Sequence, residues 1–178
     1  WTEVAQSLIY QGYNVTCPTQ TGLGERKHLL SSNITLDTFI EDIVNHIIFN
    51  NLDNVILVGH SFAGSTISGV ADILKDRINR LIYFDAVILS DAQSPFDIAP
   101  PEVVKERIAL AEKSEGKLSV PAPNPESFGV FDIRKSIMLN KQLTPHPIST
   151  FQSKLNLKNE IGNGLPLSYI FCTNPVYE

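Results

Sequence analysis

A short apolar run that turns into a helix through a single serine constrains this chain more than any other feature. Residues 55–58 (Val-Ile-Leu-Val) predict a strand that is buried on both faces. The run stops at Gly59, and the small residues 63–66 begin a helical pattern. Between the two elements the chain reads Gly59, His60, Ser61, Phe62, Ala63, Gly64. A sharp strand–turn–helix of this kind indicates a nucleophile elbow, because small neighbours allow the strained backbone that exposes the serine hydroxyl.

The match to the elbow motif has one departure. The strict motif has glycine two positions after the serine, whereas this chain has Ala63 there and Gly64 one position later. The alternative is a buried strand followed by an incidental Gly-x-Ser turn. If the elbow is real, Ser61 is the nucleophile, and the backbone N–H of Phe62 at the helix N-terminus is an oxyanion donor.

Composition excludes several classes of protein. The 178 residues are 43% hydrophobic and 19% charged, which is ordinary for one soluble globular domain. A net charge of -5 without a basic cluster disfavours a nucleic-acid partner, and no apolar run reaches the ~20 residues that cross a membrane. Two cysteines, Cys17 and Cys172, are too few for a disulfide framework, so we expect a reducing, cytoplasmic setting. No cluster has metal-ligand spacing, and Gly22 and Gly24 do not form a phosphate cradle, so we expect neither metal nor cofactor.

Helical and strand patterns alternate through the first half of the chain. Such alternation predicts an α/β protein with a mostly parallel sheet and helices on both faces. The expected helices cover residues 1–11, 37–50 and 62–74, and the expected strands cover residues 13–17, 55–58 and 80–85.

The alternation stops between residues 90 and 164. This proline-rich segment predicts a helix over 101–113 and short pieces near 131–139 and 147–154. Its phenylalanines favour an inserted lid over a disordered linker. A last strand is expected over 165–173. The predicted organisation is a core over 1–89, a lid over 90–164 and a return to the core sheet over 165–178.

The chain resembles the α/β-hydrolase fold, in particular the small esterase branch that contains plant methylesterases and hydroxynitrile lyases. The residues that carry the resemblance are 21–26, 28–29, 42–43, 55–61, 69–72, 76–78 and 81–86. The resemblance implies a serine hydrolase that acts on small carboxylic esters.

The resemblance also implies parts that this sequence does not contain. In that fold, the strand and loop that supply half of the oxyanion hole precede Trp1, and the general-base histidine follows a strand beyond Glu178. We therefore expect an internal fragment of a longer protein. Residues 1–178 alone are expected to be poorly stable and inactive.

The acid of the catalytic triad has two candidates. The family usually places it after the strand that ends at Thr173, where residues 174–178 contain no aspartate. Asp85 follows another strand, at a position that some lipases of this fold use, and Glu178 lies in the usual loop. The alternative for Asp85 is a cap at the start of the lid or a partner for a nearby base.

None of the four histidines is expected to be the base. The side chain of His60 should point away from Ser61, and His46 lies within a helix. His28 is a candidate for lining the pocket, and His146 is interpreted as a residue of a lid turn.

Three functions remain open for the complete protein. The first is hydrolysis of a small-molecule ester through an acyl-serine intermediate. The second is a hydroxynitrile-lyase-type reaction, which usually uses a lid lysine; candidates are Lys105, Lys113, Lys117 and Lys135. The third is a non-catalytic small-molecule receptor. The oligomeric state is left open.

Overall fold

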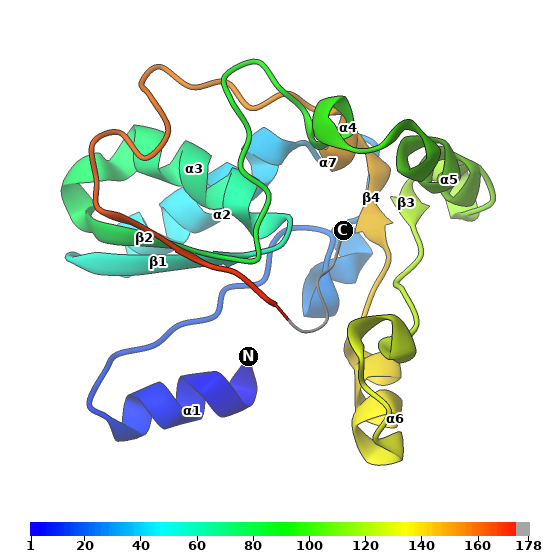
Figure 1. Ribbon diagram of the computed structural model, residues 1–178, viewed down its shortest axis with the longest axis horizontal. Helices are drawn as coiled ribbons and strands as arrows, with labels where there is room; N and C mark the ends of the chain where they lie inside the picture. The colour runs from blue at the N-terminus through cyan, green and yellow to red at the C-terminus, as the bar shows by residue number, and fades with distance from the viewer. Residues whose placement is uncertain (174–178) are drawn as a thin grey trace.

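The computed structural model describes residues 1–173, and its centre is a parallel sheet with the strand order β1-β2-β5 (Figure 1). The strands are β1 (Val55–His60), β2 (Ile78–Phe84) and β5 (Leu167–Ile170). Helices α2 (Leu36–Phe49) and α3 (Ala63–Leu74) pack on one face of this sheet. The parallel sheet and its crossover helices confirm the α/β fold class.

The core lies between the sheet and these two helices. Helix α2 begins at a capping box in which Thr35 and Thr38 exchange hydrogen bonds, which satisfies amide groups that lack a partner within the helix. Its apolar residues recur every three or four positions and therefore form one buried stripe. The largest fully buried side chains of this core are those of Tyr83, Leu36, Ile47, Leu81, Leu89, Leu155 and Val70.

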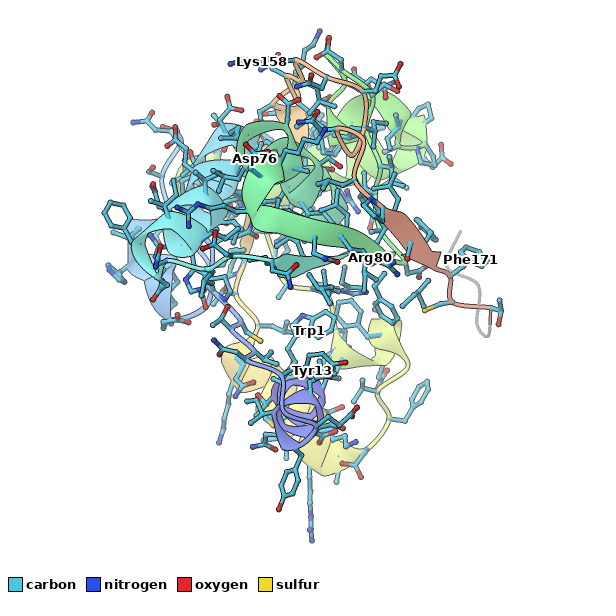
Figure 2. All side chains as sticks on the ribbon, turned by 90° about the vertical axis from the view of Figure 1, so that its left-hand side faces the viewer. Trp1, Tyr13, Asp76, Arg80, Lys158 and Phe171 are labelled. Carbon is cyan, nitrogen blue, oxygen red and sulfur yellow. The ribbon has the colours of Figure 1, made fainter. Side chains whose placement is uncertain are left out.

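The opposite face of the sheet is largely open, so the prediction that residues 55–58 are buried on both faces is wrong. Ile56 is 49% exposed and Val58 is 45% exposed. Helix α1 (Thr2–Tyr10) lies on this side but buries none of its residues. Figure 2 places Trp1 between α1 and the sheet, where its ring lies 6.2 Å from that of His60 and 6.3 Å from that of Phe84.

The strand expected over residues 13–17 does not form. The segment is extended and mostly exposed, and among the described residues it pairs with no strand. A strand needs a neighbour for its amide and carbonyl groups, and β1, which pairs only with β2 in the described part, has none on its other edge. The last strand is also shorter than the expected 165–173.

Residues 90–164 form several short elements beyond the carboxyl ends of the strands (Figure 1). The helix expected over 101–113 is α5, and the pieces expected near 131–139 and 147–154 are α6 and α7. These elements are α4 (Pro95–Ile98), α5 (Pro101–Glu112), η3 (Glu115–Lys117), β3 (Ser119–Val120), η4 (Pro125–Phe128), α6 (Ile133–Gln142), β4 (His146–Pro147) and α7 (Ile148–Gln152). Two further turns of 3-10 helix, η1 (Gly24–Leu29) and η2 (Lys75–Arg77), precede them in the chain. Among the described residues, no helix is both long and apolar enough to cross a membrane.

Candidate active site

Ser61 occupies a strained turn directly after β1. Its φ is +52°, a left-handed conformation that residues other than glycine rarely adopt. The Ser61 N–H donates to the carbonyl of Phe84 at 3.3 Å, while its own carbonyl accepts from the N–H groups of Val87 at 2.9 Å and Gly64 at 3.1 Å. Bonds from the end of β2 and the start of α3 therefore hold the turn, and the Ser61 side chain is exposed at the sheet edge.

Two glycines of the elbow are required by close approaches of the backbone. A Cβ at Gly59 would lie 2.7 Å from the carbonyl oxygen of Ala63, and one at Gly64 would collide with the carbonyl oxygen of Val87. The glycine of the strict motif is thus replaced by Gly64, one position later, where α3 meets the chain that follows β2.

Phe62 presents its N–H at the beginning of α3. Within residues 1–173, that N–H donates to no hydrogen-bond acceptor. The N-terminus of a helix carries a partial positive charge, so an unoccupied N–H there can stabilise an anion. Among the sequence candidates, the structure therefore brings together Ser61, Phe62 and the glycines at one turn.

Asp85 lies beside this turn, immediately after β2. Its φ is +42°, and its N–H donates to the carbonyl of Ile170 at 2.8 Å. The Asp85 carboxylate accepts the N–H of Cys172 at 3.5 Å. Burial, followed by the charge of Asp85, raises the pKa of the Cys172 thiol. Glu178, the other candidate acid, lies outside the described residues.

None of the four histidines hydrogen-bonds to Ser61 within the described chain. His28 is exposed, and His46 pairs with Thr16 at 2.9 Å. His60 lies against Trp1 and Phe84; partial burial there lowers its pKa, and the charge of Asp85 partly offsets this. His146 lies in β4, and its ring contacts that of Phe62.

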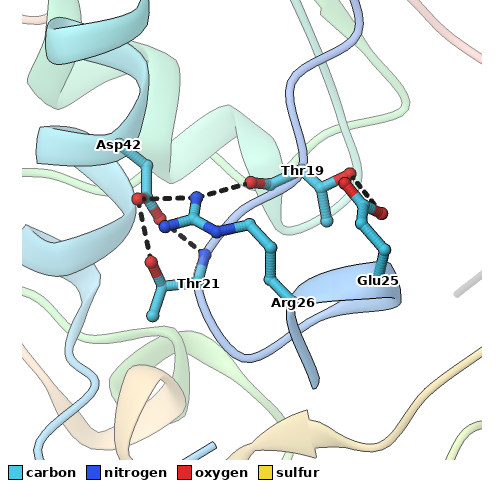
Figure 3. Close-up of polar contacts among 5 residues, drawn as sticks. All are labelled: Thr19, Thr21, Glu25, Arg26 and Asp42. Carbon is cyan, nitrogen blue, oxygen red and sulfur yellow. Dashed lines mark hydrogen bonds and ion pairs between the residues drawn. The ribbon is translucent and has the colours of Figure 1, made fainter. Parts of the chain in front are cut away.

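A polar network fixes the loop that leads to η1 (Figure 3). Asp42 of α2 accepts the N–H of Thr21 at 2.6 Å, the Thr21 hydroxyl at 2.9 Å and the Arg26 guanidinium at 3.0 Å. Arg26 also donates to the carbonyl of Thr19 at 2.9 Å, and the Thr19 hydroxyl donates to Glu25 at 3.0 Å. These bonds attach residues 19–26 to the core helix.

The loop and residues of the 90–164 segment line a cavity of about 350 Å³ that is open to solvent. The N–H of Gly24 donates to the Thr144 hydroxyl at 2.9 Å, which joins the two walls. Most of the lining is apolar; the residues are Leu23, Gly24, Pro121, Ala122, Pro123, Gln142, Leu143, Thr144 and His146. A larger hollow lies on α1 and is lined by Gln6, Ser7, Ile9 and Tyr10, none of which belongs to the elbow.

An aromatic cluster connects this cavity to the elbow, and sequence reasoning missed it. The Phe62 ring lies 4.7 Å from that of His146, 5.1 Å from that of Phe151 and 5.9 Å from that of Phe39. Phe151 also stacks on Phe96 at 5.6 Å. The sequence carries only a weak signal for the contact between Phe62 and His146. His146 lies between two prolines, which predicts a turn but does not reveal a partner 84 positions away.

Curated proteins similar to this chain are esterases. The carbendazim hydrolyzing esterase of Nocardioides sp. (strain SG-4G) is 35% identical over 165 residues, which cover 88% of this chain and 67% of that protein. The putative methylesterase 14, chloroplastic, of Arabidopsis thaliana is 29% identical over 106 residues, which cover 58% of this chain and 30% of that protein. The chain thus spans about two thirds of the first relative and under a third of the second. No protein-family model matches it.

Solved structures resemble the chain over nearly its whole length. An extracellular α/β-hydrolase from a Paenibacillus species superimposes with a TM-score of 0.84 at 32% identity, covering 97% of this chain and 72% of that one. That hydrolase is described as sharing structural and functional homology with tobacco salicylic acid binding protein 2. A methylesterase from Arabidopsis gives a TM-score of 0.69 at 22% identity, covering 96% and 71% of the two chains, and this likeness concerns the fold alone.

Proposed function

Because the chain belongs to the esterase branch of the α/β-hydrolase family, as its sequence predicted, we propose that Ser61 is the nucleophile of an enzyme that hydrolyses small carboxylic esters through an acyl-serine intermediate. The observation that carries the proposal is the strained Ser61 turn beside the Phe62 N–H, which donates to no acceptor in the part of the chain that the structure describes. Strain of this kind persists only where the surroundings enforce it, and it concentrates at active sites.

The reaction assigns one task to each group. The Ser61 hydroxyl oxygen bonds to the ester carbonyl carbon while a general base accepts its proton, and the Phe62 N–H donates to the oxygen that becomes negative. The alcohol leaves with that proton, and water then releases the acid from the acyl-serine by the same steps. We place the base outside residues 1–173, since none of the histidines there forms a hydrogen bond with Ser61.

We propose Asp85 as the acid that orients the base, with Glu178 as the alternative. Asp85 follows β2. The carbonyl of Phe84, the residue before Asp85, accepts a hydrogen bond from the Ser61 N–H. Its hydrogen bond with the Cys172 N–H is long and leaves the carboxylate able to accept another donor. Asp85→Asn and Glu178→Gln separate the candidates, because loss of the true acid lowers kcat by about four orders of magnitude.

The cavity supports a small, mostly apolar substrate. Its volume of about 350 Å³ is that of a site for a small molecule. We treat residues 90–164 as its lid and residues 1–89 and 165–178 as the core. The lining residues include no lysine, so nothing at this cavity favours the hydroxynitrile-lyase reaction. A cytoplasmic location stays a prediction; the names of the relatives include both chloroplastic and extracellular proteins.

A fluorophosphonate probe tests the nucleophile directly. We expect the intact protein to be labelled and to hydrolyse p-nitrophenyl acetate, and Ser61→Ala to lose both properties. Labelling that persists in Ser61→Ala would place the nucleophile elsewhere. Absence of labelling in a folded wild-type protein would instead favour a receptor that uses the same cavity.

A further inference from the structure

The ring of Phe62 is where the elbow meets the lid. Three aromatic rings surround it at centroid distances of 4.7 to 5.9 Å, the range in which aromatic pairs attract one another. Phe39 comes from the core helix α2 and is fully buried, whereas His146 and Phe151 come from β4 and α7. The shortest of the three contacts to Phe62 is the one with His146, whose ring plane is inclined by 60°.

The His146 ring is itself held in one orientation. Its Nε2 lies 2.9 Å from the Thr150 hydroxyl oxygen, and that hydroxyl donates its only hydrogen to the carbonyl of Pro147 at 2.8 Å. Nε2 must therefore carry the proton and donate it to Thr150. The ring also contacts Phe151 at 4.6 Å and Phe39 at 5.7 Å. Burial, followed by the positive charge of Arg107, lowers the pKa of His146 to about 4, so the ring packs as a neutral group at pH 7.

The position of the Phe62 ring bears on its backbone N–H. Rings on three sides hold the Phe62 ring in one rotamer, and a side chain fixed in this way restrains its own Cα and the nitrogen bonded to that Cα. The turn before Phe62 is strained at Ser61, and strain of this kind needs continuous support. Side-chain packing from the lid supplies support that the elbow hydrogen bonds do not.

We propose that His146 is a positioning residue that holds the Phe62 N–H in place for the oxyanion through the packing of the two rings. The proposal rests on the proposed function, because it assumes that this N–H is an oxyanion donor. His146 also lines the cavity next to Leu23 and Gly24, so one side chain contacts both the substrate space and the donor residue. The lid thereby affects the chemical step as well as binding.

The test is a set of variants of the intact protein assayed with p-nitrophenyl acetate. His146→Leu removes the aromatic ring, and we expect kcat to fall roughly 10- to 100-fold with a much smaller change in KM, since loss of a whole oxyanion donor costs about 100- to 1000-fold. His146→Phe restores a ring, and we expect it to recover most of that loss. Affinity for an aryl trifluoromethyl ketone, which forms an oxyanion on serine, should fall in parallel with kcat.

The matched control is Phe96→Leu. Phe96 stacks on Phe151 and, among the described residues, forms no ring pair with Phe62, so its loss disturbs the same cluster without removing a ring that packs on the donor residue. We expect a lower melting temperature with kcat unchanged. Equal falls in kcat for Phe96→Leu and His146→Leu, or a wild-type kcat in His146→Leu, would overturn the proposal.

Two further outcomes are informative. Should His146→Leu not fold, Thr150→Val takes its place; it frees the ring from its hydrogen bond and should lower kcat roughly 3- to 10-fold, the value of one neutral hydrogen bond, and an unchanged kcat would count against the proposal. Turnover that survives Ser61→Ala would remove the proposed function and this inference together. Turnover that depends on Ser61 but not on His146 would remove the inference alone.

Discussion

The two faces of the central sheet are built from the same strands but have different roles. On the face under α2 and α3, Leu81 is 0% exposed and Tyr83 is 1% exposed. On the other face, Ile56 and Val58 remain 49% and 45% exposed, although their side chains are as apolar as that of Leu81. Packing by helices, rather than the composition of the strands, therefore decides which side chains stabilise the fold.

The residues of the candidate site also divide between the covered and the open face of the sheet. The contacts that require Gly59 and Gly64 lie toward α3, on the covered face, and Phe62 packs against the aromatic cluster there. His60 lies on the open side with Trp1. The Ser61 turn thus depends on the covered face for its geometry.

The first prediction compares the loss of stability when one aliphatic side chain is truncated on each face of the sheet. It contains the largest expected effect, at Leu81. Leu81→Ala leaves a cavity in the core and should lower the free energy of unfolding by about 2–5 kcal/mol. Ile56→Ala, at a half-exposed position, should cost about 1 kcal/mol or less. Urea denaturation of the two variants measures both. Equal losses would mean that something covers the open face in solution.

The second prediction compares neighbours in the first turn of α3. Gly64→Ala forces a methyl group against the Val87 carbonyl, and we expect a loss of about 3 kcal/mol together with reduced fluorophosphonate labelling. Ser65→Ala is the control, because within the described chain the buried Ser65 hydroxyl has no hydrogen-bond partner. Removal of that hydroxyl should be neutral or slightly stabilising. A tolerated Gly64→Ala would contradict the role given to the close approach.

The sequence allowed much of the fold to be predicted because local patterns determined it. The periodicity of α2, the strand–turn–helix at Ser61 and the helix of α5 all depend on neighbours within a few residues. Two predictions were wrong: the strand over residues 13–17 and the burial of β1 on both faces. Both features require a neighbouring segment, which the pattern of one segment does not reveal. Pairing is a property of two segments.

The candidate site divides in the same way. The strained turn at Ser61 and the place of Phe62 at the start of α3 could be predicted, because an elbow is a local motif with its own steric requirements. The contact of Phe62 with His146 was not, since it depends on how the chain returns from the lid over a long separation in sequence. Local pattern does not identify the acid either, because both Asp85 and Glu178 follow a predicted strand in the sequence.

The third prediction concerns acid conditions and the buried His146 on the covered side of the elbow. Unfolded His146 binds a proton below pH 6.5, whereas the folded pKa is about 4, so stability falls as the pH drops from 6.5 to 4. The expected loss between pH 7 and pH 5 is about 2 kcal/mol, at 1.36 kcal/mol per pKa unit. His146→Phe removes this titration, and its unfolding free energy should vary less over that range. The same pH dependence in wild type and His146→Phe would assign the effect to other groups.

The smallest effect is expected on the open face, at His60→Phe. A phenyl ring retains the aromatic contacts with Trp1 and Phe84, whose rings lie 6.2 and 5.4 Å from His60, and it removes an imidazole whose pKa is lowered by partial burial. We expect the free energy of unfolding to change by less than about 1 kcal/mol, and the intact protein to keep its fluorophosphonate labelling. If His60→Phe loses labelling while its melting temperature is unchanged, the open face takes part in activating Ser61, and the division of roles between the two faces fails at the elbow itself.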